Sequence, residues 1–298
     1  MKVGLQINDY TFPGGPAQLG TDLARIARTA DEGGFDPIGV MDHFFQIRIE
    51  REGRIIQGGP PEHEMLEAYT TLGFLAANTS RAHLMTIVTA AVYRYPAVLA
   101  KIVTTLDVLS GGRAMLGIGA GWNEEEITAL GIPFPPVAER FDWLEDTLEL
   151  CIRMWRDDQS PFKGKRFAFE RPLNRPQALS RPRPRIMIGG SGERKTLRLV
   201  AKYADACNLF PTPDVQHKLD VLKEHCEREK RNYDEIEKTC MFHFDLGERG
   251  ENVGPIIERL KGLSRMGFTG VMGGVKDVWQ PQTLERMTRE VLPAAKAI

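Results

Sequence analysis

The chain has 298 residues, of which 42% are hydrophobic and 27% charged, and its formal net charge at pH 7 is -1. This length fits two small domains or one large α/β barrel, and the composition is that of an ordinary globular protein. The basic residues are spread along the chain, so charge gives no support for binding to nucleic acid or to a membrane surface.

The N-terminus and the cysteines predict a cytoplasmic protein. Val3 to Ile7 form an apolar run without the pattern of a signal peptide, and no run approaches membrane-spanning length. The four cysteines lie far apart and form no CxxC pair, so we expect reduced thiols in or near the core: Cys151, Cys207, Cys226 and Cys240.

Hydrophobic patterns predict eight strands that alternate with eight helices. The expected strands are 3–7, 37–41, 83–89, 114–118, 185–188, 205–209, 239–246 and 268–272. The expected helices contain residues 19–30, 65–77, 96–109, 141–155, 197–200, 215–222, 253–263 and 284–295. Strict alternation predicts a parallel sheet, and eight units favour a single closed (β/α)8 barrel over residues 1–298.

Two stretches interrupt this rhythm. Residues 44–61 form a long irregular segment after the second strand, which suits a functional loop. Residues 157–184, before the fifth strand, are rich in Pro and Arg, with a hairpin expected around 162–169. Eight basic residues between Lys163 and Arg185 predict either an anionic partner or a solvated connection. The segment follows a helix and precedes a strand, which places it at the end of the barrel opposite the strands' C-terminal ends. This position favours the solvated connection, unless the insertion folds back over the rim.

The functional residues of such a barrel follow the C-terminal ends of its strands, here called the working face. The polar and glycine positions expected there are Asn8, Asp9, Asp42, His43, Thr89, Tyr93, residues 119–123, residues 189–192, Asn208 and Asp245. Among them, His43 is the candidate acid–base group, because imidazole titrates near neutral pH. The adjacent Asp42 either orients His43 or caps the loop.

Two glycine-rich stretches stand at the ends of expected strands. Gly189, Gly190, Ser191 and Gly192 lie between a strand and a helix, so they predict a phosphate site, with a plain turn as the alternative. Glycines 117, 119 and 121 predict close backbone approach, either by a planar cofactor or at a tight bend into the next helix. This second pattern is not the dinucleotide-binding GxGxxG.

The remaining histidines predict no further site. His63 and Glu64 do not form an HExxH motif, and His243 lies in the seventh expected strand. No His, Cys and carboxylate set has metal-ligand spacing, so we expect no metal.

Several motifs, in order, resemble the luciferase-like flavin and deazaflavin oxidoreductases, and most closely the branch that uses coenzyme F420, an 8-hydroxy-5-deazaflavin. The similarity covers about residues 1 to 272. It is carried by GLQIN, VMDHFF, YRYPAVLAKIVTTLDVLSGGR, LSGGRAMLGIGAGWNEEE, ALGIPFPPVAERFDWLEDTLELCIRMW and PRIMIGGSGERKTLRLVAKYADACN.

The resemblance implies a deazaflavin across the working face, with its diphosphate on residues 189–192. It also implies a bulged, often cis, non-prolyl peptide in the third strand, behind the ring and within Thr86, Ile87, Val88 and Thr89. His43 matches the family's active-site histidine, and Asn8, Gly119, Gly121 and Trp122 would line the cofactor. A homodimer is a further family expectation.

One departure bears on the substrate. The sugar-phosphate and alcohol dehydrogenases of the family carry a catalytic Glu where this chain has Trp122, and a Trp where it has Ile47. We therefore expect an apolar or unsaturated substrate, reduced with His43 donating a proton or a hydrogen bond. The alternatives are an FMN-dependent two-component monooxygenase and a non-catalytic deazaflavin-binding carrier.

Overall fold

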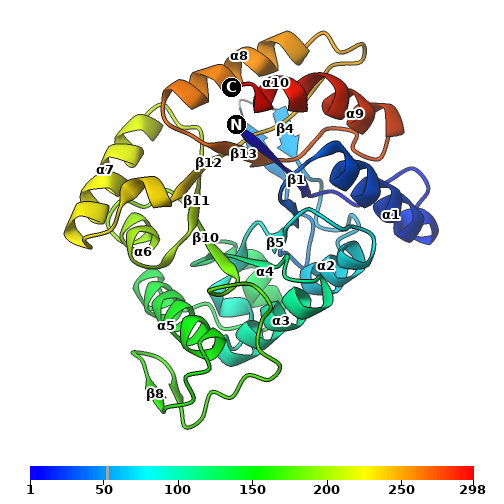
Figure 1. The fold of residues 1–298 in the computed structure, drawn as a ribbon. Coiled ribbons are helices and arrows are strands. Elements are labelled where there is room, and N and C mark those ends of the chain that lie inside the picture. The colour runs from blue at the N-terminus through cyan, green and yellow to red at the C-terminus, as the bar shows by residue number, and fades with distance from the viewer. Residues whose placement is uncertain (52–53) are drawn as a thin grey trace.

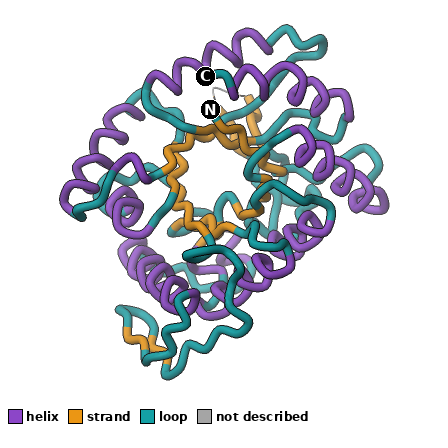
Figure 2. Tube along the Cα trace, viewed as in Figure 1, coloured by secondary structure: helices purple, strands orange, loops and turns teal. Residues whose placement is uncertain are grey.

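Parallel strands close around a central axis, and helices form an outer ring in both ribbon and tube views (Figures 1 and 2). A computed structural model describes residues 1–51 and 54–298. The strand order is β5-β2-β1-β13-β12-β11-β10-β7-β6, and a parallel bridge between Leu84 and Ala114 joins the third strand position to the fourth. The predicted (β/α)8 barrel is confirmed.

The barrel strands are β1 (Lys2–Ile7), β2 (Ile38–Val40), β5 (Leu84–Thr86), β6 (Thr89–Ala90), β7 (Met115–Gly119), β10 (Arg185–Gly189), β11 (Ala206–Leu209), β12 (Glu237–Met241) and β13 (Gly270–Gly273). The helices are α1 (Pro16–Gly33), α2 (Ala68–Ala77), α3 (Pro96–Leu109), α4 (Glu124–Ala129), α5 (Val137–Trp155), α6 (Thr196–Tyr203), α7 (Val215–Arg228), α8 (Val253–Arg265), α9 (Pro281–Arg286) and α10 (Leu292–Lys296). Single 3-10 turns cover Ala91–Tyr93 and Tyr233–Glu235, and a π-helical turn, Met287–Val291, joins α9 to α10.

Four predicted elements differ from the structure. The third strand is interrupted between Thr86 and Thr89, and the seventh ends at Met241 rather than at residue 246. The acidic helix start expected after Trp122 is a separate short helix, α4, and the closing helix is divided by its π-helical turn. The loop of residues 44–61 contains a hairpin of β3 (Ile49–Arg51) and β4 (Arg54–Gln57), and residues 52–53 of that predicted loop lie outside the described ones.

Residues of the strands alternate between two apolar layers. Those that point outward pack under the helices, as Leu116, Ile118 and Ile188 do. Those that point inward form a separate cluster with an unusual share of methionine: Met85, Ile87, Met115, Met187, Ala206 and Met272. The inside of the barrel is therefore filled by side chains and is not a pore.

The insertion before β10 contains the predicted hairpin, formed by β8 (Phe162–Lys163) and β9 (Ala168–Phe169). The hairpin lies outside α5 (Figure 1). Its Arg166 pairs with Glu139 in the first turn of α5 (2.8 Å), and Phe167 contacts Tyr95 immediately before α3. These helix starts lie at the working face, so the insertion folds back along the barrel toward the rim.

Five of the eight basic residues from Lys163 to Arg185 form ion pairs with this chain's own carboxylates. Lys165 contacts Asp142 at 3.0 Å, and further pairs are Arg175–Asp157, Arg183–Asp205 and Arg185–Glu237. These contacts support the interpretation of the segment as a solvated connection.

All four cysteines are free and buried, as expected. Among the described residues, none of the helices combines the length and the apolar character needed to cross a membrane.

Candidate active site

His43 and Glu126 form the centre of the candidate site. His43 follows β2, and its Nδ1 lies 2.6 Å from Oε2 of Glu126, a residue of α4 whose side chain is fully buried. Asn123 caps α4 by accepting a hydrogen bond from the Glu126 amide at 3.5 Å, which sets the helix start next to the end of β7. The contact joins two residues that are 83 positions apart, one after β2 and the other after β7.

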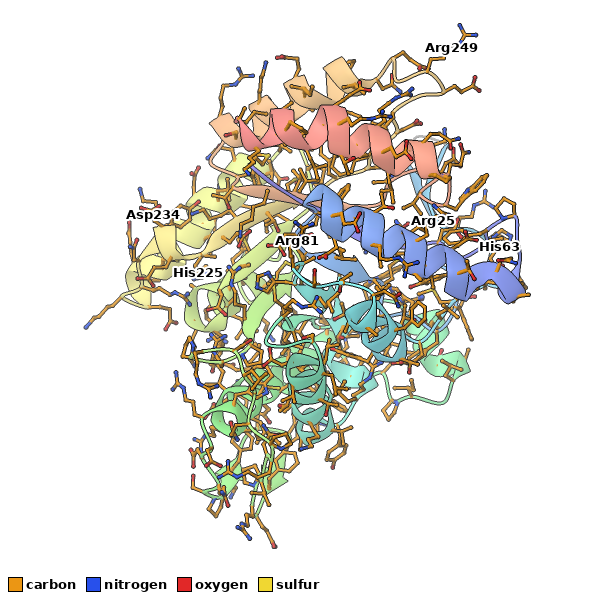
Figure 3. All side chains as sticks on the ribbon, turned by 45° about the vertical axis from the view of Figure 1, so that its right-hand side comes forward. Arg25, His63, Arg81, His225, Asp234 and Arg249 are labelled. Atoms are coloured by element: carbon orange, nitrogen blue, oxygen red, sulfur yellow. The ribbon has the colours of Figure 1, made fainter. Side chains whose placement is uncertain are left out.

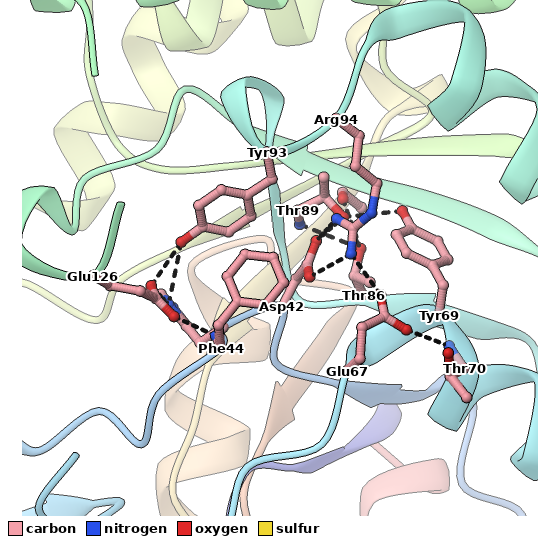
Figure 4. Close-up of polar contacts among 12 residues, drawn as sticks. Asp42, Phe44, Glu67, Tyr69, Thr70, Thr86, Thr89, Tyr93, Arg94 and Glu126 are labelled. Atoms are coloured by element: carbon pink, nitrogen blue, oxygen red, sulfur yellow. Dashed lines mark hydrogen bonds and ion pairs between the residues drawn. The ribbon is translucent and has the colours of Figure 1, made fainter. Parts of the chain in front are cut away.

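Four more donors converge on the same carboxylate, among them the side-chain amide of Asn123 at 3.4 Å from Oε2, and Figure 4 shows those from Tyr93 and Phe44. The Tyr93 hydroxyl donates to Oε2 at 2.7 Å, and the amides of Phe44 and Phe45 donate to Oε1, the latter at 3.1 Å. Burial alone would raise the pKa of Glu126, but the hydrogen bonds from His43, Tyr93 and the Phe44 amide outweigh it and hold that pKa below its usual value. Burial and the neighbouring carboxylate raise the pKa of Tyr93. His43 and Glu126 therefore form a pair in which an ionised carboxylate contacts an imidazole.

Asp42 has different partners from those predicted. Its buried carboxylate accepts hydrogen bonds from Arg94, at 2.5 and 3.0 Å, and from the Thr89 hydroxyl at 2.7 Å. Arg94 also donates to Glu67 at 2.7 Å (Figure 4). Since a buried carboxylate needs a paired cation, Asp42 is held by Arg94 and does not orient His43. Glu126 takes the orienting role that adjacency in the sequence suggested for Asp42.

The interruption of the third strand places one side chain at the mouth of the barrel. The Ile87–Val88 peptide bond is cis, within the stretch predicted to contain such a bond, and Gln6 donates to the Ile87 carbonyl at 3.0 Å. Thr86 and Thr89 are buried, and their hydroxyl oxygens lie 2.9 Å apart. Ile87 packs inside the barrel. Of the four residues from Thr86 to Thr89, Val88 is the one whose side chain is only half-buried.

The glycines of β7 make room for this neighbouring strand. A Cβ at Gly117 would meet the Thr86 carbonyl oxygen at 1.9 Å, and one at Gly119 would lie 3.3 Å from Val88. Gly121 has a φ of +83°, at the bend into α4. The close approach at Gly117 is thus made by the backbone of β5 and that at Gly119 by Val88, while Gly121 lies at the bend.

The loop of residues 189–192 lies beside Val88. A Cβ at Gly189 would meet both Val88 methyl groups at 3.1 Å, and Gly190 has a φ of +114°, which favours glycine. The Gly190 amide donates to the Asn208 carbonyl at 3.1 Å. Within residues 1–51 and 54–298, the amides of Ser191 and Gly192 donate to no protein acceptor, so they can bind an anion in front of α6.

Two other predicted site residues lie at the same face. Trp122 is 63% exposed, and its ring meets the His43 ring edge to face with centroids 5.9 Å apart. The side chain of Asn8 lies against Gly274 after β13. The backbone carbonyl of Asn8 accepts a hydrogen bond from the Gln46 side chain at 3.2 Å.

The histidines given no role lie elsewhere or make structural contacts. Figure 3 shows His63 and His225 on opposite flanks of the molecule, and the ring of His225 lies 2.8 Å from the Glu193 carbonyl. His243 follows β12, and burial lowers its pKa. In the described part of the chain, no group of three or more His, Cys, Asp or Glu side chains could hold a metal ion.

Sequence reasoning placed Tyr93 on the working face but missed Glu126 and Arg94 as partners of the site. Glu126 is the third of three consecutive glutamates, and its spacing from Asn123 is that of a capping pair. The one available signal was its place beside Ile127 on the buried face of the helix. Nothing in the sequence indicates that this face meets His43.

The family model described as luciferase-like monooxygenase matches residues 6–263. An F420-dependent glucose-6-phosphate dehydrogenase of Kineococcus radiotolerans is 32% identical over 261 residues, which are 83% of this chain and 69% of that protein. An F420-dependent secondary alcohol dehydrogenase in complex with an F420-acetone adduct shares the fold, with a TM-score of 0.79 and 17% identity over 99% of this chain and 98% of the other. A monooxygenase from Streptomyces bottropensis does so with a TM-score of 0.78 and 19% identity, over 98% and 99% of the two chains.

Proposed function

This chain belongs to the luciferase-like monooxygenase family, and we propose that it is an oxidoreductase that transfers a hydride between the deazaflavin coenzyme F420 and a small organic substrate. The observation that carries the proposal is the His43–Glu126 pair, which stands at the same end of the barrel as Val88 and the glycine loop. The F420-dependent relative from Kineococcus supports the choice of cofactor.

The residues at the mouth fit a planar ring with a phosphate-bearing chain. Gly119 and Gly189 leave space for Val88, whose half-buried side chain offers an apolar support for the ring. The amides of Ser191 and Gly192, at the start of the segment leading to α6, suit the diphosphate. These features would hold the cofactor, which when bound exchanges a hydride at its C5 carbon.

His43 supplies the proton that balances this hydride. In a reduction, the substrate carbon gains the hydride and its two electrons, while the other atom of the C=C, C=N or C=O bond gains a proton from the imidazole. The imidazole then recovers a proton from solvent. Trp122 stands against His43 and covers it from bulk water.

The surroundings of His43 favour an apolar or unsaturated substrate. Phe44, Tyr93 and Trp122 supply aromatic rings close to it. The cation of this region, Arg94, already binds Asp42 and Glu67. An anionic substrate such as a sugar phosphate would find no free charge in these residues.

Fluorescence titration with F420 and with FMN tests the cofactor. We expect saturable F420 binding, at least about tenfold weaker in Gly190→Asp, because aspartate places a negative charge and a strained φ at the diphosphate loop. Gly267→Asp is the matched control, since Gly267 has a φ of +98° with nothing near its Cβ position. Micromolar FMN binding without F420 binding would favour the alternative, an FMN-dependent monooxygenase, to which the fold of the Streptomyces enzyme is similar.

We also propose that the chain forms a homodimer through a groove between α2, α3 and residues 169–173. The groove has a volume of about 610 Å³. Exposed apolar side chains gather around it, with Val98 53%, Leu109 75% and Leu173 47% exposed. Contiguous apolar surface of this kind is a common mark of protein association.

A further inference from the structure

The buried carboxylate of Glu126 can only accept hydrogen bonds. Its Oε1 accepts from the Phe44 and Phe45 amides, and its Oε2 accepts from the Tyr93 hydroxyl. An ionised carboxylate has no proton to donate. The 2.6 Å contact between Oε2 and Nδ1 of His43 therefore requires the proton to be on Nδ1.

We propose that Glu126 is a positioning residue that fixes His43 in the Nδ1–H tautomer and so makes Nε2 the atom that exchanges a proton with the substrate. The inference rests on the proposed function, since it specifies how the same histidine acts. A neutral imidazole with hydrogen on Nδ1 has its free electron pair on Nε2. The contact of Glu126 with Nδ1 thus decides that Nε2 is the ring nitrogen that remains available for chemistry.

The geometry of the pair is well fixed from both sides. His43 is held by Glu126 below and Trp122 at its edge, and its side chain is 14% exposed. Glu126 is held by two backbone amides and by Tyr93, so its carboxylate cannot turn away without losing several hydrogen bonds. This rigidity is what a positioning residue needs.

The Nδ1–H tautomer of His43 also accounts for the proton in both directions of the reaction. In a reduction, the imidazolium loses its Nε2 proton to the substrate as the hydride reaches the carbon, and a neutral Nδ1–H imidazole remains on Glu126. In the reverse oxidation, Nε2 accepts the proton that the substrate loses with its hydride. Both directions leave the Glu126 carboxylate ionised throughout.

A structural role alone is the rival explanation, in which Glu126 only ties the residues after β2 to α4. The two explanations differ for Glu126→Gln. The glutamine carbonyl can still accept from the Phe44 and Phe45 amides, but its NH2 group must donate to Nδ1. Our proposal therefore predicts an exchange of tautomers to Nε2–H, with the fold retained.

The test uses 15N-histidine NMR of the free full-length protein at alkaline pH, together with turnover of cyclohexenone by F420-loaded enzyme. We expect Nδ1–H in the wild type and Nε2–H in Glu126→Gln. We also expect kcat to fall about 10²- to 10⁴-fold with the F420 dissociation constant within about twofold, since a wrong tautomer removes the acid–base group and leaves binding intact. Glu125→Gln, an exposed neighbour in the same helix turn, is the matched control and keeps both the tautomer and the rate.

An Nε2–H tautomer in the wild type, or an unchanged Nδ1–H tautomer in a folded Glu126→Gln, would overturn the proposal. The wild-type spectrum decides the matter even if the variant does not fold. Because the spectra need no cofactor, they separate this proposal from the cofactor assignment: wild-type protein with the expected tautomer but without F420 binding would refute only the latter.

Discussion

His43 lies three residues after the end of β2, and its Nδ1 contacts Glu126 of α4. We predict that His43→Ala binds F420 within a fewfold of the wild type and lowers kcat about 10²- to 10⁴-fold, the usual contribution of a positioned acid–base group. Fluorescence titration and steady-state kinetics measure the two quantities. Unchanged turnover in this variant would show that the proton comes from another group, and F420 binding without turnover in the wild type would favour the carrier.

At the element scale, β7 depends on glycine because of its neighbour. We predict that Gly117→Ala destabilises the protein by at least about 1–3 kcal/mol, since the added methyl would meet the backbone oxygen of Thr86, which no rotamer change can move. Chemical denaturation measures the loss. Gly262→Ala is the matched control: it adds the same methyl group to α8 with nothing within 4 Å and is expected to stabilise by about 0.5–1 kcal/mol.

Packing between α5 and α6 depends on the charge of Glu145, which binds Arg198 at 3.0 Å and Lys202 at 3.2 Å. Burial would raise the pKa of Glu145, but these cations lower it to about 2. In the unfolded chain a glutamate titrates at about 4.3. The unfolded state therefore binds the proton first as pH falls, so this contribution is complete above about pH 5 and is lost toward pH 2.

We accordingly predict that Glu145→Gln lowers the free energy of unfolding at pH 7 by about 1 kcal/mol or less, because the pair is partly screened by solvent. The difference from the wild type should shrink steadily as the pH falls from about 5 to about 3. Urea unfolding at several pH values measures it. Glu32→Gln, on the exposed side of α1, is the control, and a deficit independent of pH would contradict the ion-pair explanation.

The sequence predicted the elements well wherever hydrophobic periodicity is strong. Helix α3 has the predicted bounds, Pro96–Leu109, and every barrel strand lies at an expected position. The interruption after Thr86 could not be found from periodicity, because Ile87 and Val88 are good strand residues whose conformation depends on tertiary contacts.

The place of His43 and of residues 189–192 on the working face could be predicted from the order of the strands, and their roles there stay predictions. The candidate site was not predictable where a partner comes from a distant element, as Glu126 does for His43 and Arg94 does for Asp42. Adjacent residues in a strand end point to different partners, so sequence neighbours are a poor guide to contacts.

At the scale of the whole molecule, we propose that the apolar groove between α2, α3 and residues 169–173 is covered by a second copy of the chain. We predict a particle of twice the 33.4 kDa chain mass for the wild type, and a monomer for Val98→Asp, because a charge in the centre of an apolar interface is left unpaired. Light scattering after size exclusion measures the mass. Val137→Asp places the same charge at another exposed apolar position, at the start of α5, and should stay dimeric. A monomeric wild type would contradict the prediction.

The packing of Val88 restricts how the sequence of this barrel can evolve. Val88 packs over the Cα atoms of Gly119 and Gly189, which come from two different strands, and either glycine could gain a methyl group only if Val88 moved by a few tenths of an ångström or became smaller. Mutations at these three positions are therefore not independent: a change at one alters the fitness of changes at the others. Among descendants of a common ancestor, they should change together, leaving a three-way covariation between the segment that separates β5 from β6 and the ends of β7 and β10.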